Sequence, residues 1–189
     1  MARSPVRTET ILDAAQELIL KHGLRGTSME GIAARAGIAK PTLYVYFPDK
    51  AAVFSALLDR LVAGWRREFM DALGGEGDVV QRVGAALIAK NKAVWRLLAD
   101  SPHADELYGE HERGGAAHFA ALESELGAAI ERELAAAGAA RPRLLTQLLL
   151  AASFGIGRKA QSIAELGPAL RLLVDRLVRP ELSWAQKVS

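Results

Sequence analysis

The sequence predicts an all-α protein, with an N-terminal three-helix domain of the helix-turn-helix type and a C-terminal helical bundle, about nine helices in all. Apolar residues recur at helical spacing through most of the chain, and glycine and proline residues separate the helical segments. Half of the 189 residues are hydrophobic, which is enough for a sizeable core. The spacing predicts a first, helix-turn-helix domain in residues 1–50, a linking fourth helix over 49–73, and a second domain in 74–189.

The first helix is expected to begin at Thr8 or Thr10 and to end at Gly23. Arg3 and Arg7 lie in the leader before this helix, and Pro5 between them argues against helix there, so the leader is expected to lie along a minor groove as an arm or to be disordered.

A second, short helix is expected from Ser28 to Ala36. Thr27 or Ser28 would supply the N-cap oxygen, and Glu30 is placed to close a capping box on Thr27. Gly37 then ends the helix, because glycine adopts the left-handed conformation without a Cβ clash.

A third helix is expected to open at Lys40 or Pro41 and to run to Phe47. Leu43 with Tyr46 or Phe47 would face inward, which leaves cationic, hydroxyl and small apolar side chains outside. Such groups suit a recognition helix, since phosphates take donors and the thymine methyl takes an apolar contact. The alternative is a small helical hairpin with a solvated face.

The predicted DNA-binding residues lie at the start of the second helix, along the third helix and at the start of the fourth. The spacing of the apolar residues also allows Tyr46 to be a core residue, and Lys50 is expected to contact a phosphate. The set is Thr27, Ser28, Lys40, Pro41, Thr42, Tyr44, Val45, Tyr46 and Lys50.

Charge and composition agree with this interpretation. The net charge of +2 arises in residues 1–50, which hold seven Lys and Arg against five Asp and Glu. The chain has no cysteine, so disulfides and thiolate metal sites are excluded. The start lacks the apolar stretch of a signal peptide, and the longest nearly apolar run, 148–157, is about half a membrane span. We therefore expect a cytoplasmic protein without a membrane segment.

The two last long helices are more apolar than one core requires. Residues 144–154 are apolar on most of the helix circumference, and a second strong face runs from Leu166 to Val178 before Pro180. We expect a homodimer through these helices, and a buried central helix in a monomer is the alternative.

Residues 36–58, AGIAKPTLYVYFPDKAAVFSALL, resemble the signature of the TetR-type transcriptional regulators, and the resemblance covers residues 7–62. Two departures are Ala39, where family members usually carry a Ser or Thr cap, and Val45, at an outward position that is often polar. The resemblance implies a homodimeric repressor that a small-molecule effector releases from a palindromic, double-stranded DNA operator.

The resemblance also implies an effector site in the second domain. Its candidate residues are aromatic and histidine side chains, namely Trp95, Tyr108, His111, His118, Phe119 and Phe154. Gly114 and Gly115 would break or bend a helix there. A DNA-binding dimer without an effector is an alternative.

A metal-binding or enzymatic bundle is a third possibility. Against it, His111 and His118 are seven residues apart, whereas metal ligands on adjacent helical turns are three or four apart. No nucleophile motif or phosphate loop is present, so the sequence predicts no enzyme, no cofactor and no metal site.

Overall fold

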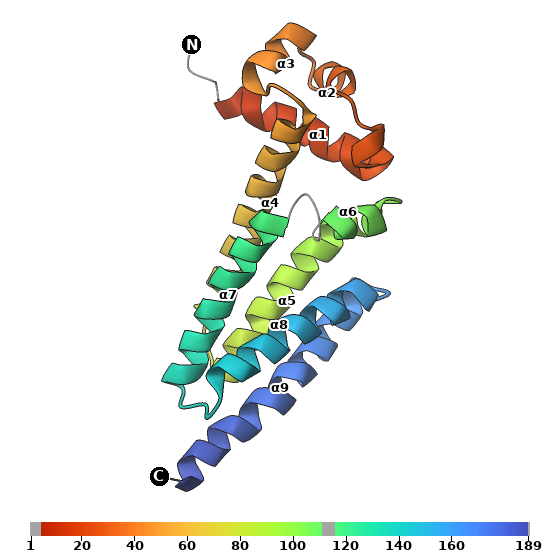
Figure 1. Ribbon diagram of the computed structural model, residues 1–189. Helices are drawn as coiled ribbons and strands as arrows, with labels where there is room; N and C mark the ends of the chain where they lie inside the picture. The colour runs from red at the N-terminus through yellow and green to blue at the C-terminus, as the bar shows by residue number, and fades with distance from the viewer. Residues whose placement is uncertain (1–4, 111–115, 189) are drawn as a thin grey trace. The chain divides into compact units, whose positions relative to one another are not determined.

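The computed structural model describes residues 5–110 and 116–188, and within these ranges the chain forms nine α-helices and no strand (Figure 1). The all-helical prediction is therefore confirmed. The helices are α1 (Pro5–Gly26), α2 (Met29–Arg35), α3 (Lys40–Tyr46), α4 (Lys50–Leu73), α5 (Val79–Leu98), α6 (Ala104–Glu110), α7 (Ala116–Ala136), α8 (Pro142–Lys159) and α9 (Ile163–Val188).

The helices divide into two compact units. The first consists of Met1–Val62 with Leu98–Phe119, and the second of Ala63–Leu97 with Ala120–Ser189. Helices α4 and α7 each contribute residues to both units. The first unit thus includes a segment, 98–119, from the part of the chain that the sequence assigns to the second domain.

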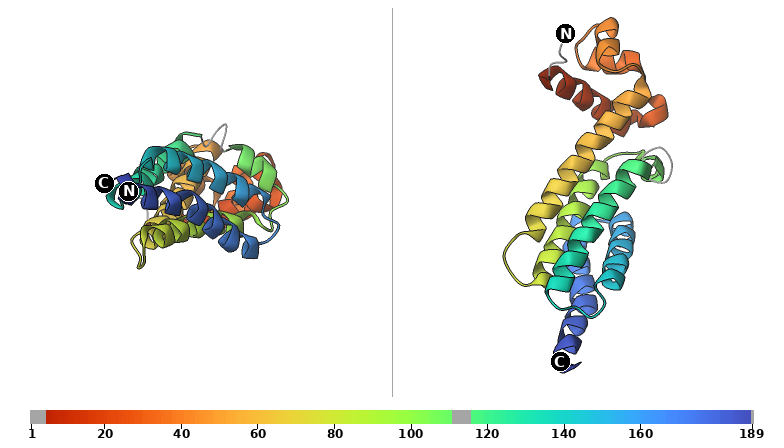
Figure 2. Two further views of the ribbon diagram at one scale, coloured as in Figure 1. Left: turned by 90° about the horizontal axis from the view of Figure 1, so that it is seen from below. Right: turned by 60° about the vertical axis from the view of Figure 1, so that its left-hand side comes forward.

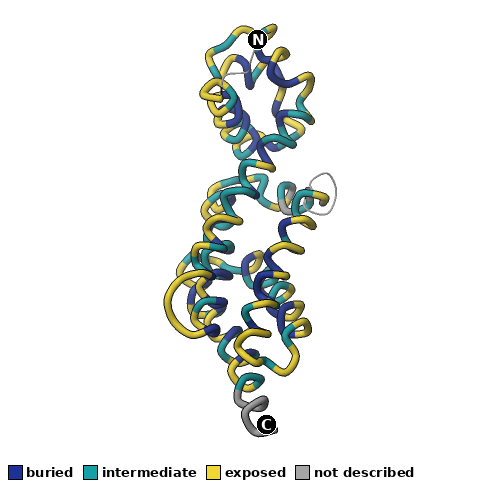
Figure 3. The backbone as a smooth tube through the Cα atoms, turned by 90° about the vertical axis from the view of Figure 1, so that its left-hand side faces the viewer, coloured by how far each residue is buried: buried dark blue, intermediate teal, exposed yellow. Residues whose placement is uncertain are grey.

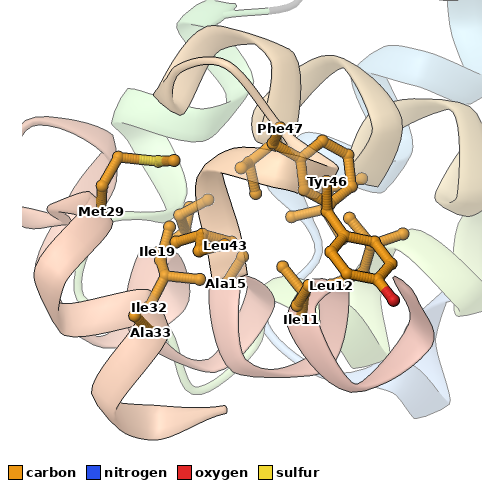
Figure 4. Close-up of a cluster of buried hydrophobic side chains, with 12 residues drawn as sticks. Ile11, Leu12, Ala15, Ile19, Met29, Ile32, Ala33, Leu43, Tyr46 and Phe47 are labelled. Carbon is orange, nitrogen blue, oxygen red and sulfur yellow. The ribbon is translucent and has the colours of Figure 1, made fainter. Parts of the chain in front are cut away.

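The core of the first unit is an apolar cluster shared by α1, α2, α3 and the start of α4 (Figure 4). Ile32 and Leu43 are fully buried, as their spacing predicts, and Ala33 is buried with them. Ala36 and Ile38 are partly buried against the same cluster. Its members are Ile11, Leu12, Ala15, Ile19, Met29, Ile32, Ala33, Leu43, Tyr46, Phe47, Val53 and Leu57.

Helix α1 begins earlier than its sequence suggests. Pro5 is its first residue, where the missing N–H costs no hydrogen bond, so the expectation of a non-helical segment up to Thr8 is wrong for residues 5–7. The expected break at Gly23 is present, because this residue has φ 73° and ψ 169° inside the assigned helix. The last turn, up to Gly26, follows that kink.

Segment 98–119 is attached to the first unit by polar and apolar contacts. Ser101 donates from Oγ to the carbonyl of Leu20 in α1, at 2.7 Å, and Leu107 of α6 packs against the core cluster. His118 of α7 places Nε2 3.3 Å from Ser55 Oγ and 3.3 Å from Asp59 Oδ1, both on α4.

The second unit is a bundle in which α8 and α9 run side by side (Figures 1 and 2). Four apolar residues at four-residue spacing along α7 are buried, namely Leu122, Leu126, Ile130 and Leu134. Buried and exposed residues alternate along the helices at helical spacing, as the tube in Figure 3 shows. Ion pairs lie at the bundle surface, including Arg82–Glu133 at 2.7 Å.

Helix α9 continues past Pro180, where the sequence predicts that its strong apolar face ends. Beyond this proline, Glu181 accepts hydrogen bonds from Arg141 at the start of α8, one of them over 3.1 Å from Nε. Pro180 lacks the backbone N–H that would form a hydrogen bond within α9. The ion pair links the residue after it to the start of α8.

Candidate nucleic-acid interface

The N-terminus of α2 is capped by one residue. Ser28 is the N-cap, and its Oγ accepts a hydrogen bond from the backbone N–H of Gly31 at 3.1 Å. The capping box predicted between Glu30 and Thr27 is absent from the described hydrogen bonds, because Thr27 Oγ1 donates to Gly23 O at 2.8 Å and Glu30 pairs with Lys40.

The turn between α2 and α3 depends on Gly37. Its φ of 66° lies in the left-handed region. Gly37 donates to Ala34 O over 3.2 Å and Ile38 donates to Ala33 O over 3.0 Å, which is the Schellman pattern of a helix C-terminus. The sequence predicted this turn correctly.

Helix α3 starts without a side-chain cap, since Ala39 is its N-cap and carries no hydrogen-bonding group. Pro41 in the first turn lacks the N–H that would otherwise remain unpaired. Leu43, Tyr46 and the following Phe47 are buried in the core cluster (Figure 4), and these anchors fix which face of the helix points to solvent.

The outward face of α3 carries an apolar and an aromatic side chain. Val45 is 63% exposed and Tyr44 is 44% exposed, whereas Thr42 is half-buried. Pro41 is exposed beside them. This seven-residue helix therefore exposes most of Val45 and nearly half of Tyr44 to solvent.

The charge on this face comes from Lys40. Its ammonium forms an ion pair with Glu30 of α2 and lies 6.0 Å from the centre of the Tyr44 ring. The hydrogen bond between the two charges lowers the pKa of the Glu30 carboxyl and raises the pKa of Lys40. Both side chains are at least half exposed, so the pair is accessible to a ligand.

Three of the predicted DNA-binding residues lie elsewhere. Thr27 and Tyr46 are buried, and the ring of Tyr46 lies among the cluster near Ile11 and Leu12 (Figure 4). Lys50 donates from Nζ to Leu24 O at 2.8 Å and to Thr27 O at 2.9 Å. These bonds join its ammonium to one carbonyl in the last turn of α1 and to one just after the helix, contacts that the sequence alone does not predict.

The predicted effector residues are distributed between the two units. Trp95 on α5 and Phe154 on α8 belong to the second unit, and both are half-buried. Phe119 and His118 belong to the first, as does the backbone of Tyr108 in α6. The Nδ1 atom of His118 is buried without a hydrogen-bond partner. His111 and the two glycines at 114 and 115 lie outside the described residues.

The described residues contain neither a metal-binding cluster nor a membrane-spanning helix. No group of three or more His, Asp or Glu side chains there is arranged to hold a metal ion. None of the helices described is both long enough and apolar enough to span a membrane.

The N-terminal sequence and the fold of this chain are similar to those of known bacterial regulatory proteins. Residues 11–57 match the model of the bacterial regulatory proteins of the tetR family. The HTH-type transcriptional regulator EthR of Mycobacterium tuberculosis is 45% identical over 56 residues, which are 30% of this chain and 26% of EthR. The HTH-type transcriptional activator FasR of Mycolicibacterium smegmatis is 38% identical over 110 residues, which are 53% of this chain and 48% of FasR.

The matches to these two relatives thus span about a quarter of EthR and about half of FasR. A similarity that extends further is to a solved TetR/AcrR-family transcriptional regulator from Thermobifida fusca. Its TM-score is 0.73 at 26% identity, and the match covers 89% of this chain and 96% of that one. Residues 11–57 therefore belong to the tetR family of bacterial regulatory proteins, and the chain as a whole has the fold of a TetR-type regulator.

Proposed function

We propose that the protein is a sequence-specific DNA-binding transcriptional regulator that places α3 in the major groove. The observation that carries this proposal is the α2–α3 motif, in which a Schellman turn at Gly37 and buried Leu43 leave Val45 and Tyr44 exposed. The similarity to regulators over residues 11–57 supports the same conclusion. As a DNA-binding protein it would act in the cytoplasm.

Each exposed group of α3 has a role in this proposal. Lys40 and Val45 approach base edges, where an ammonium suits guanine acceptors and an isopropyl group suits the thymine methyl. Tyr44 and Thr42 donate to phosphates, with Ser28 and Pro41 at the border of the contact. Thr27, Tyr46 and Lys50 support the motif from within.

We infer that the protein acts as a homodimer through α8 and α9. Among the side chains of α8 and α9 that the structure describes, three large apolar ones are exposed in the single chain: Leu144 and Leu148 are each 45% exposed, and Leu172 is 58% exposed. Covering such side chains is favourable, and a second copy supplies an identical surface around a two-fold axis. Two copies would then read half-sites about 34–36 Å apart in a palindromic operator.

We further propose that a small-molecule effector releases the dimer from DNA, and that repression is the mode of regulation. Helix α4 begins directly after the recognition helix and extends into the second unit, so a tilt of α4 would move α3. An effector can cause this change only if it binds the released dimer more tightly than the DNA-bound dimer. The relative FasR is named an activator, so the sign of regulation needs a direct test.

The experiment is a gel shift with DNA that flanks the protein's own coding region, with random competitor DNA and across a salt series. We expect tight binding that resists competitor at an inverted repeat. Weak binding that disappears with salt would contradict sequence-specific recognition. A transcription assay from the bound fragment then distinguishes repression from activation, and a thermal-shift screen of small molecules distinguishes the effector-controlled dimer from an effector-independent one.

A further inference from the structure

We propose that Glu30 is a positioning residue for DNA recognition, which holds Lys40 on the reading face and keeps its charge from nonspecific attraction to phosphates. The inference rests on the proposed function, and it adds a residue of α2 that the sequence placed in a capping box. Its basis is the ion pair between Glu30 and Lys40 and the position of the ammonium near Tyr44.

Glu30 and Lys40 come from different helices, so their pairing fixes a side chain that would otherwise be mobile. Lys40 is the first residue of α3, and it has four rotatable side-chain bonds. The ammonium pairs with the carboxylate from α2 and lies over the Tyr44 ring, 6.0 Å from its centre. The pair therefore selects one orientation of Lys40 before DNA is bound.

The pair also compensates for an unfavourable placement. A cation in the first turn of a helix meets the positive end of the helix dipole, and α3 has no acidic residue in its own first turn. Glu30 supplies the missing negative charge from the neighbouring helix. Retaining a cation at this position is thus consistent with a role for Lys40 beyond stability.

The effect on DNA binding follows from the charge. A free lysine at this position adds a contact to any phosphate within reach, which raises affinity for all sequences alike. A lysine already paired with a carboxylate gains less from a phosphate. Its three N–H donors still leave capacity for an acceptor on a base edge. Glu30 therefore lowers affinity for random DNA more than affinity for the operator.

The test uses the full-length protein and the variants Glu30→Gln, Lys40→Met and their combination, with operator and random duplexes measured across a salt series. A second ion pair of the same domain, Arg35–Glu17, has similar exposure and does not involve α3, so Glu17→Gln is the matched control with the same change in net charge. Circular dichroism checks that all variants remain folded.

We expect Glu30→Gln to steepen the salt dependence of random-DNA binding by about one unit of slope. If the variant and the wild type bind random DNA equally at 1 M salt, the variant then binds it about eightfold more tightly at 0.1 M salt. Operator affinity should rise no more than about twofold, so the specificity ratio falls roughly fourfold. Glu17→Gln should leave the ratio unchanged. In the Lys40→Met background, Glu30→Gln should have no further effect.

Two results would overturn the inference. Equal effects of Glu30→Gln and Glu17→Gln would mean that net charge alone is responsible. An effect of Glu30→Gln that persists in the Lys40→Met background would mean that the carboxylate repels DNA directly, without positioning Lys40. A wild-type protein that binds no sequence specifically would instead refute the proposed function, and the two failures are therefore distinguishable.

Discussion

Replacing Lys50 with methionine is predicted to destabilise the first unit without changing the salt dependence of DNA binding. The ammonium donates to the carbonyls of Leu24 and Thr27 over 2.8 and 2.9 Å. Methionine keeps most of the apolar stem and removes both hydrogen bonds, so the variant isolates the polar contribution.

The magnitude follows from these two bonds. A hydrogen bond from a charged donor contributes about 1.5–3 kcal/mol, and partial access of water to this site favours the lower part of that range. Two bonds near the lower end of that range are expected to lower the free energy of unfolding by about 3–4 kcal/mol on removal. For a chain of this size that corresponds to a decrease in Tm of roughly 6–16 °C.

The assay combines urea unfolding with operator binding across a salt series, and Lys21→Met, an exposed lysine of α1, is the control for loss of one charge. The sequence alone predicts a phosphate contact for Lys50, which would lower the salt slope by about one unit. If the slope falls by one unit while stability is unchanged, the structural role of Lys50 is refuted.

Three further predictions concern other parts of the chain. Gly37→Ala should lower stability by about 1–2 kcal/mol because Gly37 has a φ of 66°, although no atom lies within 4 Å of an added Cβ. The control is Gly64→Ala, where an added Cβ has as much space but the backbone is helical, and this change should stabilise by about 0.5–1 kcal/mol. Changes of the same sign for both variants in urea unfolding would contradict this account. Burial lowers the pKa of Lys90, so the unfolded state binds more protons between the folded and unfolded pKa values, and stability should rise with pH over that interval. Lys90→Met should be more stable at neutral pH and lack that rise, and a wild-type Tm with the same pH dependence as that of the variant would refute this prediction. Leu148→Glu should convert the dimer to monomer in sedimentation experiments, whereas Ala121→Glu, an exposed residue of α7, should not; a dimer that survives the change at Leu148 would exclude α8 from the interface.

The features that the sequence predicted well are local. The Ser28 cap, the turn at Gly37 and the inward positions of α3 depend on residues within a few positions of one another, and each has a strong physical preference. The Oδ1 atom of Asp49, directly before α4, likewise accepts a hydrogen bond from the nearby Ala52 N–H over 2.8 Å. Such preferences can be interpreted without knowledge of the tertiary fold.

The features that the sequence missed depend on contacts between distant segments. Lys50 reaches carbonyls more than 20 positions earlier, and Ser101 reaches Leu20 across 81 positions. Glu30 could form either a local capping box with Thr27 or an ion pair with Lys40 of the next helix, and in the structure it pairs with Lys40. Likewise, the apolar spacing of 98–119 predicts no particular neighbour, so its attachment to the first unit was not foreseeable.

The most direct test of the central claim, that α3 reads DNA sequence, is selection of binding sites from a random duplex pool by the wild type and by Val45→Asn. The side chain of Val45 is 63% exposed, so the substitution should leave folding intact. We predict that the wild type selects an inverted repeat and that the variant changes the preferred base at symmetric positions of both half-sites. An identical consensus for the two proteins, or no consensus for the wild type, would contradict the proposal that α3 recognises bases.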